Sequence, residues 1–287
     1  MINVGSAVVN SLLLAFATNN SNGFSTFRNK QPTSITITAP IINNIMTDER
    51  MIAGSNGDII SRLRSLGMDK KELKRHARLR RASILVPLFE RSHHSNSNNK
   101  DASPAASSSS NIHVLFTQRL SNMASHAGEV CFPGGVQDTE DCQDDVQTAL
   151  REAYEEVGLE NQYIDCIARM NTVESKHSLC VTPIIGWIHP PSKAEPSELQ
   201  LNAEEVDIAF AVPLQYFANP TNCHSIDMYK WKGGNVEIRT YLYDDPESGR
   251  QFKIWGLTAH VVHKVAQLAF GGGEIKTKSE CMFPYCK

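Results

Sequence analysis

The 287-residue chain lacks most of the features that assign a protein to a specialised structural class. Its seven cysteines are odd in number and include no CxxC pair, which argues against a disulfide framework or a zinc site and favours reduced thiols inside the cell. No apolar run approaches the length that spans a bilayer. A net charge of −3 gives no reason to expect nucleic acid as a partner. The composition is ordinary for a soluble globular protein.

Acidic residues are absent from positions 1–47, where only Arg28 and Lys30 carry charge. This stretch is rich in Asn, Ser and Thr and contains one apolar run, at 12–16. An acid-poor, serine-rich leader is typical of an organelle transit peptide. We therefore expect residues 1–55 to be a targeting or disordered leader that favours the mitochondrion, with another organelle or the cytoplasm as alternatives. A secretory signal is disfavoured because no basic residue precedes the apolar run.

We expect residues 56–81 to form a basic helical segment. Four apolar residues recur at helical spacing before Gly67: Ile59, Ile60, Leu63 and Leu66. The stretch that follows is strongly basic, and a solvated charged face is its default interpretation. A sharper hypothesis is that one or two of its cations meet a phosphate of the substrate. The cations are Lys70, Lys71, Lys74, Arg75, Arg78, Arg80 and Arg81.

The remaining pattern predicts a domain of both strands and helices at 82–272. Strands are expected at 83–89, 112–117, 163–172, 179–188, 206–212 and 236–243, and a helix at 257–268. Between the first two strands, the low-complexity segment 91–111 is expected to be a disordered insertion, and 273–287 a flexible tail. The order is not a repeating βαβ pattern, so on pattern alone the fold is α/β or α+β.

The most informative stretch is 132–159, FPGGVQDTEDCQDDVQTALREAYEEVGL, in which a glycine turn and an acidic loop precede a carboxylate-rich helix. Asp144 followed by Gln147 is typical of a capping box, and Gly158 of a left-handed helix end. A helix is therefore expected from Asp144 to Val157. Its carboxylates at i, i+3 and i+4 share one arc of about 100°: Glu152, Glu155 and Glu156.

Three like charges on one arc repel one another, and a divalent cation removes the repulsion. Mg²⁺ usually binds through a few carboxylates together with substrate phosphates. The alternative is a solvated acidic face. The turn at Gly134 and Gly135 favours the metal site, because its backbone N–H groups can approach an anion.

These features together resemble the Nudix box, which consists of a glycine, an acidic residue and then REUXEEXGU, where U is aliphatic. The second half is complete at 151–159, with Ala153 at the first aliphatic position. The loop between Gly135 and Arg151 is two residues longer than in the standard box. This loop, with Asp138 and Asp141 inside it, is similar to that of the family branch that hydrolyses coenzyme A.

The residues upstream agree with that branch. Residues 115–135 resemble its second signature, through Arg119, His126–Glu129 and Phe132–Gly135. Leu120 stands where the branch usually has a serine, which is a departure. VTPIIGW at 181–187 and IWGLTA at 254–259 also fit, so the resemblance covers roughly residues 80 to 270.

The resemblance implies a Nudix fold, in which a mixed β-sheet is sandwiched between α-helices. It implies hydrolysis of the diphosphate bond of coenzyme A or acyl-CoA to 3′,5′-ADP and 4′-(acyl)phosphopantetheine, with Mg²⁺ or Mn²⁺ as cofactor. NADH or ADP-ribose as substrate, or a catalytically silent nucleotide-binding module, are the alternatives. The expected partner is a small molecule, with neither nucleic acid nor a membrane involved.

The resemblance also assigns roles to individual residues. The catalytic candidates are Arg151, Glu152, Glu155, Glu156 and Glu205, and the metal ligands among them are Glu152, Glu155 and Glu156. The substrate-binding candidates are Arg119, His126, Gly134 and Gly135. The general base stays open among the helix carboxylates, Glu205 and Glu129.

Three of these interpretations concern how a side chain is used. Arg151 adjoins the carboxylates, so we expect it to orient a glutamate rather than to meet phosphate. His126 is expected to be a hydrogen-bonding scaffold residue. Cys131 is expected to be a small buried hydrophobic residue.

Overall fold

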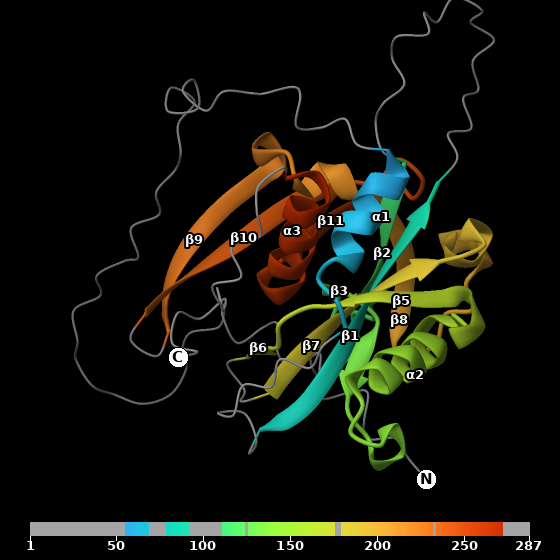
Figure 1. Ribbon diagram of the computed structural model, residues 1–287. Helices are drawn as coiled ribbons and strands as arrows, with labels where there is room; N and C mark the ends of the chain where they lie inside the picture. The colour runs from blue at the N-terminus through green and yellow to red at the C-terminus, as the bar shows by residue number, and fades with distance from the viewer. Residues whose placement is uncertain are drawn as a thin grey trace, which may run out of the picture.

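The protein is represented by a computed structural model that describes residues 55–68, 79–91, 111–123, 126–175, 179–231 and 234–271 (Figure 1). Most of the expected leader and insertion, and the whole 273–287 tail, lie outside the described residues. Within the described ranges, no helix is both long and apolar enough to cross a membrane.

The described elements follow one another in this order: α1 (Asn56–Arg64), β1 (Arg80–Glu90), β2 (Ile112–Arg119), β3 (Val130–Cys131), β4 (Gly134–Val136), α2 (Asp145–Val157), β5 (Ile164–Arg169), β6 (Val173–Glu174), β7 (Leu179–Ile188), β8 (Val206–Pro213), β9 (Cys223–Trp231), β10 (Gly234–Asp244), β11 (Gln251–Trp255) and α3 (Gly256–Phe270). Short 3-10 turns lie between several of them.

The main sheet is mixed and has the strand order β3-β2-β1-β7-β5, with β4 paired to β1, β6 to β7 and β8 to β2. Only β1 and β7 run parallel among these described pairs, and the others are antiparallel. A smaller antiparallel sheet has the order β11-β10-β9. Because β1 lies in the centre, it pairs along its length with β2, β4 and β7, and it carries the glycine turn of β4 at its start.

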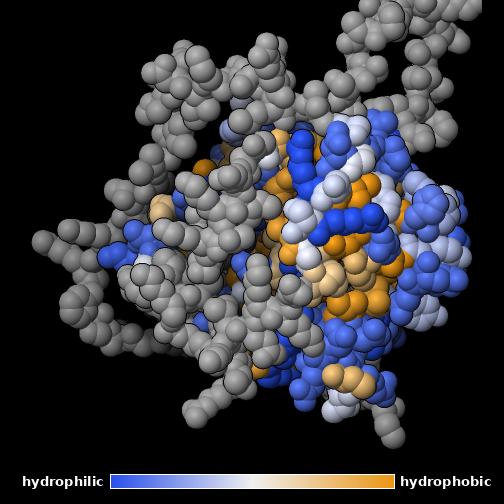
Figure 2. Space-filling view, viewed as in Figure 1, coloured by the Kyte–Doolittle hydropathy of each residue, from blue (hydrophilic) through white to orange (hydrophobic). Residues whose placement is uncertain are grey.

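Helices cover both faces of the main sheet. On one face α2 packs its alanines and Val157 against Leu85, Phe89 and Ile184 of the sheet. On the other face α1 and α3 share a larger core with the alternate residues of the same strands. Figure 1 shows α2 on one side of β1 and β7, and α1 with α3 on the other. In the same view, Figure 2 shows hydrophobic residues around β5, between α1 and α2, inside a hydrophilic rim. The expected mixed sheet between helices is confirmed.

Helix α2 forms where its pattern predicts it. Asp144 is the N-cap, and its carboxylate accepts a hydrogen bond from the N–H of Val146 at 2.9 Å. Gly158 ends the helix in the left-handed conformation, with φ of 69°. The capping box is incomplete, since the exposed Gln147 makes no return bond to Asp144 among the described contacts. The cap and the glycine fix where the helix begins and ends.

The strands expected from alternation and apolar runs are also present. The bounds of β7 are those expected, and the bounds of the others are shifted by a few residues. The helix expected at 257–268 is α3. The strands β9 and β11 were not predicted, because β9 contains mixed polar residues and β11 is only five residues long. Of the expected basic segment, α1 is described and residues 69–78 lie outside the described part of the chain.

Candidate active site

The glycine turn of β4 lies directly against helix α2. A Cβ atom placed on Gly135 would come within 1.9 Å of Oε1 and 2.3 Å of Oε2 of Glu152, so no side chain fits there. The N–H of Gly134 donates a hydrogen bond to Oε2 of Glu156 at 3.4 Å. The turn thus brings backbone into contact with two carboxylates of the helix.

Glu152 and Glu156 are buried, with exposed fractions of 0% and 1%. Three of their four carboxylate oxygens accept no hydrogen bond; only Oε2 of Glu156 does, from Gly134. Among the described residues, the other buried side-chain nitrogen and oxygen atoms without a hydrogen bond belong to Ser83 and Arg119. Buried polar atoms in folded proteins are nearly always paired, so this concentration marks a place where a bound group completes the contacts.

The electrostatic environment of Glu152 disfavours its negative charge. Burial raises the pKa of Glu152 to about 7, although the positive charge of Arg151 opposes the shift. The negative charges of Glu155 and Glu205 add to the rise. An additional positive charge at this place would therefore be stabilising.

Glu156 is in a similar environment. Burial raises the pKa of Glu156 well above its ordinary value, and the charges of Glu152 and Glu205 raise it further. Arg119 and the Gly134 N–H oppose the shift only in part. Two adjacent buried carboxylates with oxygens that accept no hydrogen bond suit a divalent cation, which takes oxygen ligands and cancels their repulsion.

Arg151 is held by several oxygen acceptors at once. Its Nε and Nη2 donate to Oδ1 and Oδ2 of Asp141 at 2.9 Å and 3.0 Å, and its Nη1 donates to Oε2 of Glu155 at 2.9 Å. Nη2 also donates to the carbonyl of Val136 at 3.2 Å and forms an ion pair with Oε1 of Glu152 at 3.0 Å. Burial alone would lower the pKa of Arg151, but these acidic neighbours raise it. The contacts agree with the expected orienting role.

The three helix carboxylates do not point to one place. Glu152 and Glu156 face the glycine turn, whereas Glu155 is half-buried and paired with Arg151. Among the described residues, no three Asp, Glu, His or Cys side chains already stand together as a cation site. Mg²⁺ often uses only one or two carboxylates plus substrate phosphates. Glu152 and Glu156 fit that requirement, and Glu155 could join only by leaving Arg151.

Arg119, near the end of β2, is 2% exposed. Its Nη1 lies 3.8 Å from Oε2 of Glu205, and its Nε and Nη2 donate to no described acceptor. The charge of Arg119 acts on Glu156, and that of Glu205 acts on both Glu152 and Glu156, so all four belong to one site. A buried guanidinium with two unused donors is suited to an anionic oxygen such as that of a phosphate.

His126 is buried and takes a left-handed backbone conformation, with φ of 61°. Its Nδ1 lies 3.1 Å from Oε2 of Glu129, and the carbonyl of Glu129 accepts the N–H of Arg119 at 2.9 Å. These contacts fasten the 126–129 turn to β2, as the scaffold interpretation expected. Glu129 is buried, whereas the side chain of Glu205 is 21% exposed, so Glu205 is the more suitable carboxylate from outside the helix.

The thiol of Cys131 is buried, and burial raises its pKa to about 12. Its Sγ lies 3.2 Å from Oγ1 of Thr117 on the neighbouring strand. The thiol is therefore protonated at neutral pH and packs as a small apolar group, as expected.

The structure changes the hypothesis for the basic segment. Arg81 donates to the buried Asp145 at the start of α2, with Nη2 3.0 Å from Oδ2, and Arg169 binds the same carboxylate. Arg81 therefore fastens α2 to the sheet. The hypothesis that a cation of the basic segment meets a ligand phosphate stays a prediction. Arg80 is exposed, and Arg78 lies outside the described residues.

Sequence reasoning missed two residues of the site. Asp141 was noted only as part of the longer loop, although it is the main partner of Arg151. Ser83 is a buried serine among apolar residues of β1. A polar residue within an apolar strand was the only feature of the sequence that could have drawn attention to it.

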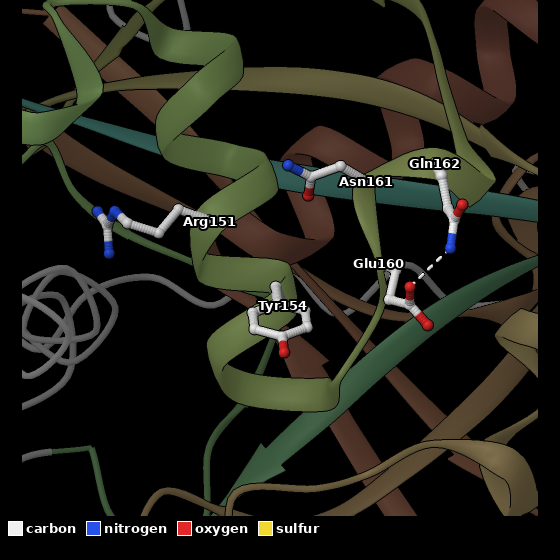
Figure 3. A pocket seen from close by; sticks show the side chains of 5 residues that line it. All are labelled: Arg151, Tyr154, Glu160, Asn161 and Gln162. Carbon is white, nitrogen blue, oxygen red and sulfur yellow. Dashed lines mark hydrogen bonds between the residues drawn. The ribbon is translucent and has the colours of Figure 1, made fainter.

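A shallow hollow of about 470 Å³ lies near the C-terminal end of α2 (Figure 3). It is lined by Arg151, Tyr154, Glu160, Asn161 and Gln162. Figure 3 shows the guanidinium of Arg151 pointing away from Glu160 and Gln162, which bond to each other at 2.7 Å. Tyr154 is 58% exposed, so the hollow opens on the solvent side of the helix, away from the buried carboxylates.

Comparison with known proteins gives several clear relatives. The chain is 33% identical over 227 residues to a mouse protein named peroxisomal coenzyme A diphosphatase NUDT7, covering 79% of this chain and 81% of that protein. It is 32% identical over 191 residues to Nudix hydrolase 15, mitochondrial, of Arabidopsis thaliana, covering 67% of this chain but only 59% of that protein. It is 36% identical over 154 residues to the Nudix hydrolase NudL of Photorhabdus laumondii, covering 54% of this chain and 75% of that protein.

Two further comparisons add little. No family model matches the chain. Among solved structures, a Nudix hydrolase from M. smegmatis, RenU, is 18% identical with a TM-score of 0.34, covering 48% of this chain and 72% of that one. That superposition is too partial for a comparison of sites.

Proposed function

Because the chain belongs to the Nudix hydrolase family, we propose that it hydrolyses the diphosphate bond of coenzyme A or acyl-CoA. The products would be 3′,5′-ADP and 4′-(acyl)phosphopantetheine. The family and the hydrolase class were predicted from the motif at 151–159, and both are confirmed by these relatives. The substrate is the proposal. It is supported by the name of the mouse relative and by the upstream signature around Arg119.

Three buried carboxylate oxygens of Glu152 and Glu156 that accept no hydrogen bond support a metal-dependent reaction most directly. One of them, Oε1 of Glu152, forms an ion pair with Arg151. They lie beside the glycine turn and next to Arg119, whose two unused donors suit a phosphate. Unpaired acceptors and unpaired donors in one buried place match a ligand that carries both a cation and an anion. A diphosphate with its divalent cation is such a ligand.

Hydrolysis of a diphosphate requires charge neutralisation and an oriented water, because the linkage is anionic and kinetically inert. Mg²⁺ or Mn²⁺, held by Glu152 and Glu156, would screen the phosphates and acidify the attacking water. The side chain of Arg119 would bind a phosphate oxygen through Nε and Nη2, which donate to no described acceptor. Arg151 keeps Glu152 in place through the ion pair at 3.0 Å.

Glu205 is the residue we assign to accept the proton of the attacking water. It lies in the connection before β8, outside α2, and its side chain is partly exposed. A carboxylate that is partly open to solvent can pass the proton on, whereas Glu152 and Glu156 are buried. Glu155 and Asp141 together hold Arg151 in place. Glu155 would leave Arg151 only if it became a ligand of the cation.

Product analysis by mass spectrometry tests the proposal. The full chain is incubated with Mg²⁺ or Mn²⁺ and, separately, with coenzyme A, acetyl-CoA, NADH and ADP-ribose. The variants Glu156→Gln and Glu205→Gln are run in parallel. Glu160→Gln is the matched control, because Glu160 is an exposed glutamate just beyond α2 whose side chain bonds only Gln162 among the described residues.

We expect the parent and Glu160→Gln to release 3′,5′-ADP from coenzyme A, and Glu156→Gln not to release it. If only NADH or ADP-ribose is cleaved, the assignment of the helix carboxylates is retained and the proposal of coenzyme A as substrate is rejected. No metal-dependent cleavage of any substrate would favour the nucleotide-binding module.

We also propose that residues 1–55 direct the protein to the mitochondrion. The proposal rests on the acid-poor, serine-rich composition of that stretch. The relatives named above carry both mitochondrial and peroxisomal names, so they support an organelle without choosing one. A fluorescent protein fused after residue 55 should co-localise with a mitochondrial marker, and diffuse fluorescence would refute the assignment.

A further inference from the structure

Ser83 is a buried residue of β1 whose hydroxyl has no hydrogen-bond partner in the described part of the chain. Its exposed fraction is 0%, and its Oγ makes no hydrogen bond to any described residue. Its neighbours along the strand, Ala82 and Ile84, are part of the apolar core beneath α1 and α3. A buried hydroxyl without a partner costs free energy, so its presence in an apolar strand calls for a ligand or a function.

The side chain of Ser83 points to the α2 face of the sheet. Successive residues of a strand alternate between faces, and Ala82 and Ile84 face the opposite core. Leu85, two residues beyond Ser83, packs under α2. Ser83 therefore lies on the same face as α2.

Ser83 is directly opposite Gly135 in the antiparallel pair of β1 and β4. Residues opposite each other in such a pair share a face, and their Cβ positions are about 4.5–5.5 Å apart. The Cβ position of Gly135 is only 1.9 Å from Oε1 of Glu152. The hydroxyl of Ser83 consequently lies within a side-chain rotation, or one bridging water, of the Glu152 carboxylate, whose two oxygens accept no hydrogen bond.

We propose that Ser83 is a positioning residue for Glu152. Its hydroxyl donates a hydrogen bond to the Glu152 carboxylate, directly or through one water, and holds that carboxylate against the glycine turn while another oxygen binds the divalent cation. Glu152 is the acceptor and Ser83 the donor, so one contact gives a hydrogen bond to two buried groups that otherwise lack one. This inference rests on the proposed cation-binding role of Glu152.

The expected consequence is on metal affinity. A hydrogen bond from an outer residue fixes the orientation of a ligating carboxylate, and loss of such a contact typically weakens metal binding 10–100-fold. Arg151 already restrains Glu152 from one side, at 3.0 Å. Ser83 restrains it from the sheet side, so we expect an effect near the lower end of that range, about tenfold.

Mn²⁺ binding followed by electron paramagnetic resonance tests the proposal without reference to turnover. The full chain and the variants Ser83→Ala, Ser83→Cys and Glu152→Gln are titrated with Mn²⁺. Cys has nearly the volume of Ser but is a weak donor, so it separates hydrogen bonding from packing. Ser175→Ala is the matched control, because Ser175 is a buried serine whose hydroxyl accepts the N–H of Leu179.

We expect Ser83→Ala and Ser83→Cys to raise the Kd for Mn²⁺ about tenfold and to broaden the bound spectrum, while thermal melting stays cooperative. Ser175→Ala should leave the Kd unchanged. A Kd for Ser83→Cys equal to that of the parent would overturn the hydrogen-bond role. If Glu152→Gln binds Mn²⁺ as tightly as the parent, the metal assignment itself fails, and the inference fails with it. Loss of binding in Glu152→Gln with no change in either Ser83 variant would reject only the role of Ser83.

Discussion

Arg151 binds both carboxylate oxygens of Asp141, with Nε 2.9 Å from Oδ1 and Nη2 3.0 Å from Oδ2. Asp141 is itself fixed, since it accepts the N–H of Asp138 at 2.8 Å and the hydroxyl of Thr148 at 3.0 Å. The acidic loop before α2 therefore controls the position of the guanidinium that contacts Glu152. This arrangement explains why the loop is folded tightly onto the helix.

Replacement of Asp141 by Asn should weaken both the fold and catalysis. The variant keeps the side-chain shape but removes the charge that pairs with Arg151, so the free energy of unfolding should fall by about 2 kcal/mol. The kcat for coenzyme A should fall about tenfold with little change in KM, because Arg151 orients a carboxylate rather than binding substrate. Urea unfolding and steady-state kinetics measure the two effects. Asp138→Asn, at an exposed position of the same loop, should change neither by more than a small amount.

The contribution of Asp141 to stability should depend on pH in acid. Burial alone would raise the pKa of Asp141, but hydrogen bonds from Arg151, the Asp138 N–H and Thr148 outweigh it and lower the pKa below 3.8. When the pKa of a carboxyl is lower in the folded than in the unfolded state, the group stabilises the protein at pH values above its unfolded-state pKa. This contribution is lost as the pH falls through the folded-state pKa. The stability difference between the parent and Asp141→Asn should therefore be constant from about pH 7 to 5 and shrink below about pH 4. A difference that grows on acidification would contradict the ion pair.

Glu152→Gln should make the metal-free protein more stable and the enzyme inactive. Burial raises the pKa of Glu152 to about 7, so at pH 8 the group is ionised in both states and its charge costs the folded state free energy. Removing that charge should raise the free energy of unfolding by on the order of 2 kcal/mol. Hydrolysis should fall by more than about 100-fold because a cation ligand is lost.

Glu155→Gln is the contrasting variant for that measurement. Glu155 is partly exposed and paired with Arg151 at 2.9 Å, so its replacement should not stabilise the metal-free protein. Chemical unfolding at pH 8 with a chelator present compares the two variants directly. Destabilisation by Glu152→Gln would show that its charge is satisfied within the protein and would count against a cation site.

Gly135→Ala should displace the carboxylate of Glu152. The added Cβ would lie 1.9 Å from Oε1, a distance that no pair of unbonded atoms tolerates. We expect the Kd for Mn²⁺ to rise by about tenfold or more. Gly57→Ala is the control, because its Cβ would meet only Oγ of Ser55 at 3.8 Å and should stabilise α1 by roughly 0.5 kcal/mol. Equal Mn²⁺ binding by the parent and Gly135→Ala would place the metal elsewhere.

The sequence was informative wherever the determining interactions are local. The cap at Asp144, the left-handed Gly158 and the apolar repeat of α2 all act within a few residues of chain, and the helix forms at the expected place. The same holds for β1 and β2, whose apolar runs predicted buried strands. The motif and the upstream signature together identified the family before any fold was known.

Only the tertiary structure decided which of the equivalent carboxylates face the glycine turn. Glu152, Glu155 and Glu156 share one arc of the helix, but Glu155 is drawn to Arg151 while the other two are buried. The placement of Ser83 opposite Gly135 likewise depends on the register between β1 and β4, which are about 50 residues apart in the chain. Local periodicity determines whether a segment forms a helix or a strand. The partner of a buried polar group is set by contacts between distant segments, which no local pattern encodes.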